Sequence, residues 1–265
     1  MNQKAIDELE QNMRDGAKKA YDENLFLTGS FSDFQSRIIE SLIVINIAQI
    51  LLKWAIRNEF QIRLEYPIRH FYNGAFPNFI FTKRRGNDNT KFLQRLNHTP
   101  NTTKHGRVDI VVTREPVLNV DGAYVDPKLL SLIGIEIKSI NKSIKDIEND
   151  FIRMATGVGL QDDVSSSSIQ AGYCLFYRRL DNPRDINSDE QIKKIKEEDF
   201  TKWSKIFSNL LTQKQNLIFN IDPIIISEGS FENLKEYYSP DEFEANEIAE
   251  LTGLVVCYLV RITRK

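Results

Sequence analysis

The chain has 265 residues, of which 41% are hydrophobic and 27% are charged, and its formal net charge is -2. These values are typical of a soluble globular protein with a substantial core, in one large domain or two small ones. The near-neutral charge indicates no polyanionic partner by itself, but it excludes none, because a nucleic-acid groove needs only a locally basic surface.

Two helices are predicted near the amino terminus. The terminus is polar and shows no signal peptide, and residues 4–22 have the pattern of a charged amphipathic helix. Residues 31–58 are predicted to form one long helix, with Ser32 or Asp33 as its cap. Because this helix is apolar nearly all round, we expect other elements to cover most of its surface.

The most apolar stretch of the chain, residues 42–56, lies inside this second helix. It is too short to span a bilayer comfortably, and it contains Asn46, Gln49 and Lys53. A buried core helix is therefore predicted in place of a membrane span. We expect a cytoplasmic protein with no membrane association.

A first strand is predicted at residues 61–69, where apolar and polar residues alternate until about Pro67. Residues 71–107 are rich in Asn, Gly, Thr and Pro and show no clear periodicity. Their second part, residues 83–107, carries seven basic residues against Asp88 alone, which is the strongest local positive charge of the chain. This stretch is a candidate contact for a phosphate backbone.

Strands and one helix alternate in the middle of the chain. Residues 107–113 and 132–140 are expected to be strands, separated by a turn-rich insertion. Ser143 is expected to open a helix, and Asp146 completes a capping box. Residues 170–178 form a nearly continuous apolar run, which is typical of a central strand buried on both faces.

The last part of the chain is predicted to add a charged helix and two strands. The helix covers residues 188–215 and is interrupted or bent near Asp199, and the strands cover residues 217–227 and 253–262. Between these strands, residues 228–250 carry eight acidic residues against one lysine. We expect this acidic stretch to lie away from a nucleic acid or to mimic it at an interface.

This succession of elements predicts an α/β fold with a mixed central β-sheet flanked by helices. Residues 1–30 are expected to be a helical extension, residues 31–185 the core, and residues 186–265 a helix and strand extension packed on the same domain. Cys174 and Cys257 lie in apolar runs and are far apart in sequence, so we expect two buried thiols in a reducing compartment.

The third predicted strand carries a carboxylate and an amine two residues apart, Glu136 and Lys138. Both project from one face, and Ile135 and Ile137 anchor the other face in a core. In the preceding predicted strand, Asp109 stands among apolar residues, where an aspartate is costly unless it is paired or binds a metal. If the two strands form a hairpin, Asp109 and Glu136 meet across it.

Two carboxylates from adjacent strands suit a hard cation such as Mg²⁺, and the main-chain carbonyl of Ile137 supplies a third oxygen. Such a metal lowers the pKa of a bound water and screens a phosphate. Lys138 would then position or deprotonate the water, or offset charge in the transition state. A structural salt bridge between Glu136 and Lys138 is the alternative interpretation.

Asp109 followed by Glu136-x-Lys138, and then by a helix and a buried strand, resembles the PD-(D/E)xK nuclease superfamily over residues 34–180. The resemblance implies a restriction-endonuclease-like core, with all three residues catalytic and Mg²⁺ or Mn²⁺ as the cofactor. Val108 stands where the proline of the family name would be. The separation of 27 residues between Asp109 and Glu136 requires an insertion.

The same resemblance implies a glutamate on the preceding helix that assists metal binding. Glu40 is the natural candidate, and Glu65 on the first strand competes for the role. The implied function is a metal-dependent DNA endonuclease of a restriction or other defence system, with a possible homodimer and no small-molecule cofactor.

DNA is expected to contact basic residues around this site, although for any single one a solvated surface position is the alternative. The candidates are Lys83, Arg84, Arg85, Lys104, Arg107, Lys142 and Arg153. Two other functions stay open. One is a non-catalytic nucleic-acid-binding or regulatory protein on the nuclease fold, and the other is a nuclease subunit that needs a partner.

Overall fold

The computed structural model describes residues 1–28, 40–76, 79–81, 106–115, 123–125, 129–140, 142–161, 166–181, 189–228 and 254–265. Its helices are α1 (Gln3–Thr28), α2 (Glu40–Arg57), α3 (Ile68–Asn73), α5 (Ile144–Val158) and α6 (Asp189–Leu211). Its strands are β1 (Gln61–Pro67), β2 (Phe79–Phe81), β3 (Arg107–Arg114), β4 (Ala123–Val125), β5 (Leu130–Lys138), β6 (Ala171–Asp181), β7 (Leu217–Glu228) and β8 (Leu254–Arg264). None of the helices in these ranges is long and apolar enough to cross a membrane.

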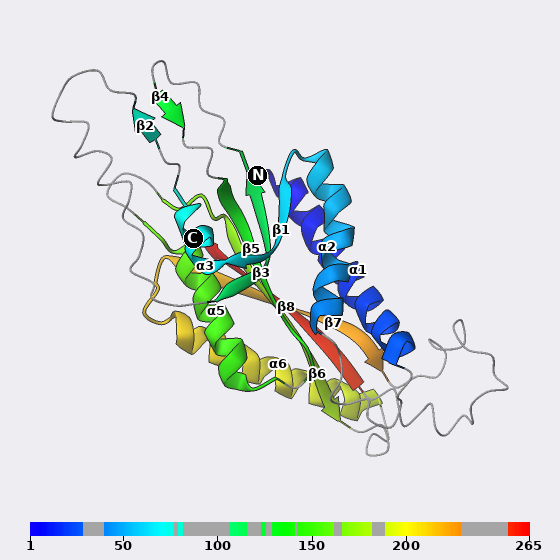
Figure 1. Ribbon diagram of the computed structural model, residues 1–265. Helices are drawn as coiled ribbons and strands as arrows, with labels where there is room; N and C mark the ends of the chain where they lie inside the picture. Colours follow the sequence, from blue (N-terminus) through cyan, green and yellow to red (C-terminus); the bar gives the residue numbers. More distant parts are fainter. Residues whose placement is uncertain are drawn as a thin grey trace.

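Six of the strands form one mixed sheet in the order β1-β3-β5-β6-β8-β7, and β2 pairs separately with β4. β5 and β6 run parallel, and the other neighbours in the large sheet run antiparallel. The connection between the two parallel strands contains α5, as a parallel pair requires (Figure 1). The predicted α/β fold with a mixed central sheet is confirmed.

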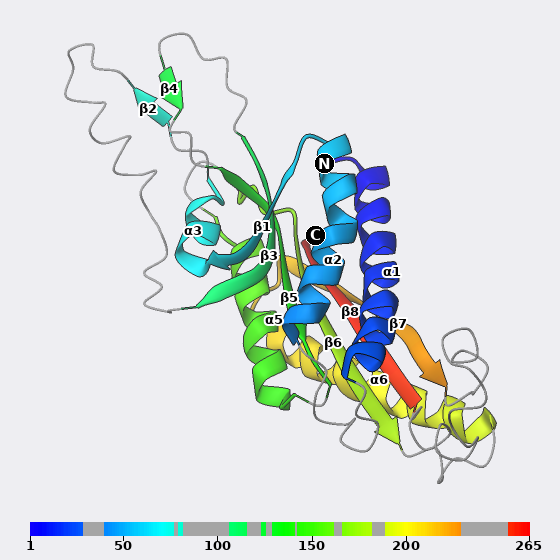
Figure 2. The same cartoon turned by 45° about the vertical axis from the view of Figure 1, so that its right-hand side comes forward.

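Helices cover both faces of the sheet, so the molecule has three layers (Figures 1 and 2). α1 and α2 pack on one face, and α3, α5 and α6 pack on the other. The alternation of β5 explains this arrangement, because Ile135 and Ile137 belong to the α1 and α2 side while Gly134 faces α3 and α5. A Cβ atom on Gly134 would lie 2.6 Å from Phe71 and 2.8 Å from Met154, so glycine permits close packing there.

The first helix and the last two strands share their cores with the central strands. Leu9 and Met13 of α1 are fully buried in the same cluster as residues of α2, and Trp54 Nε1 donates a hydrogen bond to the carbonyl of Ala5 at 3.0 Å. β8 pairs with β6, and β7 forms the edge of the sheet beyond it. Both terminal regions therefore bury apolar surface against the central sheet.

Local sequence signals set several boundaries. β1 ends at Pro67 as predicted, but residues 68–73 then fold into the short helix α3, which the sequence did not indicate. Ser143 caps α5 as predicted, and its Oγ accepts a hydrogen bond from the main-chain N–H of Asp146 at 3.1 Å. The predicted start of the second helix at residue 31 lies outside the described residues.

The predicted interruption of the charged helix near Asp199 is wrong. α6 continues through Asp199 without interruption. Trp203, Phe207 and Leu211 are buried at helical spacing, so packing against the sheet favours one continuous helix. Asp199 lies 3.8 Å from Arg178 of β6, and this ion pair accommodates the acid within the helix.

Replacement of Gly134 by alanine should destabilise the fold. The added Cβ would overlap Phe71 and Met154, so we expect the free energy of unfolding to fall by about 1–3 kcal/mol in urea denaturation. Lys145→Ala, at an exposed position of α5, should change it by less than about 0.5 kcal/mol. Equal unfolding midpoints for Gly134→Ala and the wild type would contradict this account of the packing.

Candidate functional site

The candidate site lies where β3 and β5 end their pairing beside α5. The pairing of the two strands runs to Ile110 and Ile135, and continuing this antiparallel register would place Asp109 across from Glu136. At this point the carboxylate of Asp109 accepts a hydrogen bond from the main-chain N–H of Ile137 at 2.7 Å. The two acids of the motif thus lie near each other, and the main chain of β5 fixes the carboxylate of Asp109.

Glu136 is a buried carboxylate with a cationic partner. Its side chain is 1% exposed, and it forms an ion pair with the guanidinium of Arg153 on α5. Burial raises the pKa of Glu136 well above its ordinary value, and the carboxylates of Asp150 and Asp109 raise it further, while Arg153 opposes both.

Lys138 is held among three oxygen atoms. Its Nζ lies 3.0 Å from Asp150 Oδ2 and 3.4 Å from Glu40 Oε1, and it donates to the main-chain carbonyl of Ile137 at 3.2 Å. Burial by itself lowers the pKa of Lys138, but the carboxylates of Asp150, Asp109 and Glu40 outweigh burial and raise the pKa above its usual range. Lys138 is therefore a fixed cation at neutral pH.

Glu40 reaches the motif from the other face of the sheet. It is the first residue of α2, and its Oε2 accepts the main-chain N–H of Ser139 at 3.3 Å and lies 3.6 Å from Lys142 Nζ. Glu65, the competing candidate, is more than half exposed and pairs instead with Arg107 at 3.8 Å. The structure thus places Glu40, and not Glu65, against the lysine of the motif.

Asp150 belongs to this cluster, and sequence reasoning missed it. Its side chain is 6% exposed, and its two oxygens lie 3.0 Å from Lys138 Nζ and 3.4 Å from Arg153 Nη2. A signal for it exists in the sequence, because Asp150 falls between Ile147 and Met154 on the apolar stripe of α5. A carboxylate at such a position needs a buried cationic partner.

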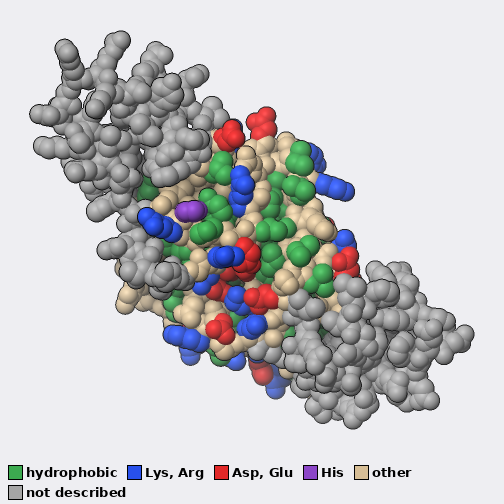
Figure 3. Space-filling model, viewed as in Figure 1, with side chains coloured by type: hydrophobic (Ala, Val, Ile, Leu, Met, Phe, Trp, Pro, Cys, Tyr) green, Lys and Arg blue, Asp and Glu red, His purple; other side chains and the backbone are tan. Residues whose placement is uncertain are grey.

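The residues predicted to contact DNA lie in different environments or outside the described residues. Lys83, Arg84, Arg85 and Lys104 lie outside the described residues. Arg107 and Lys142 are exposed near the site, whereas Arg153 points inward to Glu136. On the face between α2 and α5, acidic and basic side chains lie side by side (Figure 3).

The donors match a hard divalent cation in kind, since Asp109, Glu136 and the carbonyl of Ile137 are all oxygen ligands. Their partners are nevertheless basic groups of the chain: Arg153 pairs with Glu136, and Lys138 donates to the carbonyl of Ile137. Among the described residues, no three His, Cys, Asp or Glu side chains are arranged to hold a metal ion. A metal would therefore have to replace at least one of these internal cations.

The Asp109 carboxyl is a weaker acid in this cluster than it would be in water. Burial raises its pKa to about 6, the Ile137 N–H and Lys138 lower it, and Glu40 and Asp150 raise it. Among the described residues, four carboxylates (Asp109, Glu136, Asp150 and Glu40) face the three cationic groups of Lys138, Lys142 and Arg153. The surplus of negative charge favours either protonation or a bound cation.

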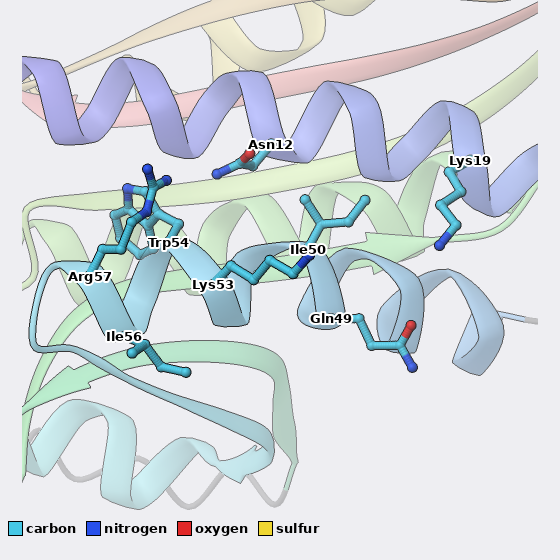
Figure 4. Close-up of a pocket in the computed structure, with 8 residues that line it drawn as sticks. All are labelled: Asn12, Lys19, Gln49, Ile50, Lys53, Trp54, Ile56 and Arg57. Atoms are coloured by element: carbon cyan, nitrogen blue, oxygen red, sulfur yellow. The ribbon is translucent and has the colours of Figure 1, made fainter.

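A separate groove lies between α1 and α2, with a volume of about 780 Å³ (Figure 4). Trp54 and Ile50 of α2 and Asn12 of α1 are among its lining residues, and none of the lining residues belongs to the motif. This groove is therefore distinct from the carboxylate cluster.

Comparison of the chain with protein-family models, with curated proteins and with solved structures finds no match.

Asp109→Asn should change how stability depends on pH. With its raised pKa, Asp109 binds its proton more tightly in the folded chain than in the unfolded chain, so it costs stability as the pH rises from about 4 through about 6. The neutral amide avoids this loss. In chelator-containing buffer, the unfolding free energy of Asp109→Asn relative to the wild type should therefore increase from pH 4 to pH 7 by up to about 3 kcal/mol.

The control for this measurement is Gln213→Ala, at an exposed position after α6, which changes no titratable group and should leave the pH dependence unchanged. A difference between Asp109→Asn and the wild type that stays constant over this pH range would contradict the assignment of the raised pKa to Asp109.

Proposed function

We propose that the protein is a metal-dependent DNA endonuclease that hydrolyses phosphodiester bonds, with a restriction-endonuclease-like core. The observation that carries the proposal is the meeting of Asp109, Glu136 and Lys138 with Glu40 at one end of the central sheet. Three separate elements, β3, β5 and α2, supply these four residues. The resemblance assigns roles to the same four residues.

The order of elements supports this proposal. α2 precedes the antiparallel strands β1, β3 and β5, and α5 then leads to the parallel strand β6. Asp109 lies on the middle strand of the three and Glu136 and Lys138 lie on the third, as the motif requires. β8 and β7 add to the sheet beyond β6.

Asp109, Glu136 and the carbonyl of Ile137 are the groups that would hold Mg²⁺ or Mn²⁺. When bound, such an ion supplies a water of lowered pKa and screens the charge of a phosphate. The hydrogen bond from the main-chain N–H of Ile137 fixes the orientation of the Asp109 carboxylate. Ile135 and Ile137 fix the strand in the core behind the site.

Lys138 has an electrostatic role in this proposal. Its raised pKa keeps it protonated at neutral pH, which favours stabilising negative charge on the phosphate over removing a proton from water. Asp150 on α5 and Glu40 on α2 orient its Nζ from opposite faces of the sheet, at the end of β5. Loss of either acid would leave the ammonium less well positioned.

Exposed basic residues support the part of the proposal that concerns DNA binding. Arg107 begins the strand that carries Asp109, and Lys142 follows the strand that carries Lys138. Both are suitable for phosphate contacts, which position a duplex without reading its sequence. A restriction or other defence role and a homodimer belong to the same proposal.

A second function is favoured by one observation. Glu136 already has an internal partner in Arg153, as it would in a structural ion-pair network. A non-catalytic nucleic-acid-binding or regulatory protein, or a nuclease subunit that requires a partner, would also fit this arrangement. Calorimetric titration with Mn²⁺ separates the cases, because a non-catalytic protein needs no metal, whereas an incomplete nuclease binds metal and fails to cleave.

The direct test of the proposal is cleavage of plasmid DNA with Mg²⁺ or Mn²⁺. Asp109→Ala and Lys138→Ala should each lower the cleavage rate by about 10²-fold or more, because each removes a charge that acts on the reacting phosphate or its metal. Lys4→Ala removes an exposed lysine of α1, on the opposite face of the sheet from α5, and should retain the wild-type rate. Unchanged cleavage in both motif variants would remove this mechanism.

A further inference from the structure

Arg153 bridges three acceptors at the centre of the site. Its Nη1 pairs with Glu136 and donates to the main-chain carbonyl of Arg107 at 3.3 Å, and its Nη2 lies 3.4 Å from Asp150 Oδ1. Its own main-chain carbonyl accepts a hydrogen bond from the hydroxyl of Tyr72 at 3.0 Å. The hydroxyl of Tyr72 on α3 therefore anchors the backbone of Arg153, while the guanidinium joins a motif acid to an acid outside the motif.

The guanidinium and a metal ion have the same electrostatic effect on Glu136. A carboxylate that is 1% exposed needs a neighbouring positive charge to stay ionised. Two cations at one buried carboxylate would repel each other strongly in this low-dielectric environment. Binding of a metal by Glu136 and pairing of Glu136 with Arg153 therefore exclude each other.

Asp150 can keep Arg153 paired when Glu136 no longer does. It contacts Arg153 through one oxygen and Lys138 through the other, so it stays paired when Glu136 changes partner. The side chain of Arg153 is 24% exposed, and its contact with Arg107 lies at the exposed start of β3. A guanidinium released from Glu136 can stay beside Asp150 and point towards this exposed edge.

We infer that Arg153 is an internal counter-ion that occupies the metal-binding carboxylate Glu136 until a divalent cation displaces it. The inference rests on the proposed function, in which Glu136 is a metal ligand. Displacement keeps Arg153 next to Asp150, and Arg153 is thus a positioning residue that acts through Glu136.

The consequence is an inverse effect of Arg153 on metal affinity. A residue that merely supports the fold would lower metal affinity when it is removed, because the site would loosen. A competing counter-ion has the opposite effect, since its removal leaves Glu136 without the partner that a metal must displace. The sign of the change in affinity therefore distinguishes the two roles.

The test is calorimetric titration of the full chain with Mn²⁺, without DNA. Arg153→Gln should bind Mn²⁺ about tenfold more tightly than the wild type, because one charge-assisted hydrogen bond no longer has to be broken. The matched control is Arg261→Gln, since Arg261 pairs with Glu10 at 2.8 Å on the opposite face of the sheet and its loss should leave Mn²⁺ affinity unchanged.

Each outcome is decisive. Binding by Arg153→Gln that is tighter than the wild type, or binding by the variant alone, supports the inference. Equal or weaker binding by Arg153→Gln, with binding by the wild type, overturns the inference and leaves the proposed function intact. Absence of binding in both proteins overturns the inference and the proposed function together.

A measurement on the wild type covers the case in which Arg153→Gln does not fold. The Nε–H resonance of Arg153, assigned from its loss in Arg153→Lys, should shift in nitrogen-15 spectra as diamagnetic Mg²⁺ saturates the protein. The corresponding resonance of Arg261 should stay in place. Saturation with Mg²⁺ and no shift of the Arg153 resonance would overturn the inference.

Discussion

A carboxylate buried in the central sheet is the constraint on which the arrangement of this protein depends. Glu136 is 1% exposed, and in such a position a lone negative charge is unstable. Arg153 compensates it from α5, Asp150 holds Arg153, and Lys138 in turn holds Asp150. The chain of alternating charges continues to Glu40 on α2 and ends at the exposed Lys142, so it links α5 and α2 to the strand of the buried acid.

The three-layer fold makes this chain of contacts possible. β5 has neighbours on both sides, and its alternation places Ile135 and Ile137 in the core beneath α1 and α2 while Glu136 faces α5. The parallel pairing of β5 with β6 requires a crossover, and that crossover is α5 itself. The same topology that buries the apolar strand therefore brings the helix with Asp150 and Arg153 next to the motif.

The same side chains both stabilise the fold and set the charge and position of the motif residues. Ion pairs that satisfy buried charges also keep Lys138 protonated and hold Asp109 and Glu136 where a hard cation would need them. Because the carboxylates outnumber the cationic groups around them, the site gains from any additional positive charge, whether a proton or a metal. Pairing of Glu136 with Arg153 neutralises the most buried acid of this cluster within the chain itself.

The sequence by itself determined what depends on neighbouring residues: the alternating strand of Glu136 and Lys138, the cap at Ser143, and the end of β1 at Pro67. These follow from side-chain periodicity and backbone hydrogen bonds, which act over a few positions. The apolar stripe of α5 also contains a signal for the buried acid Asp150.

The partners of Asp150 could not be predicted from the sequence, and neither could the choice between Glu40 and Glu65, because both depend on how α2 and α5 cross the sheet. The tertiary structure also decided that α6 is continuous, since packing of Trp203 outweighs local charge, and that Arg153 points into the site and not towards solvent. Contacts between residues distant in the chain have no local signature, and they alone turn a short motif into a site.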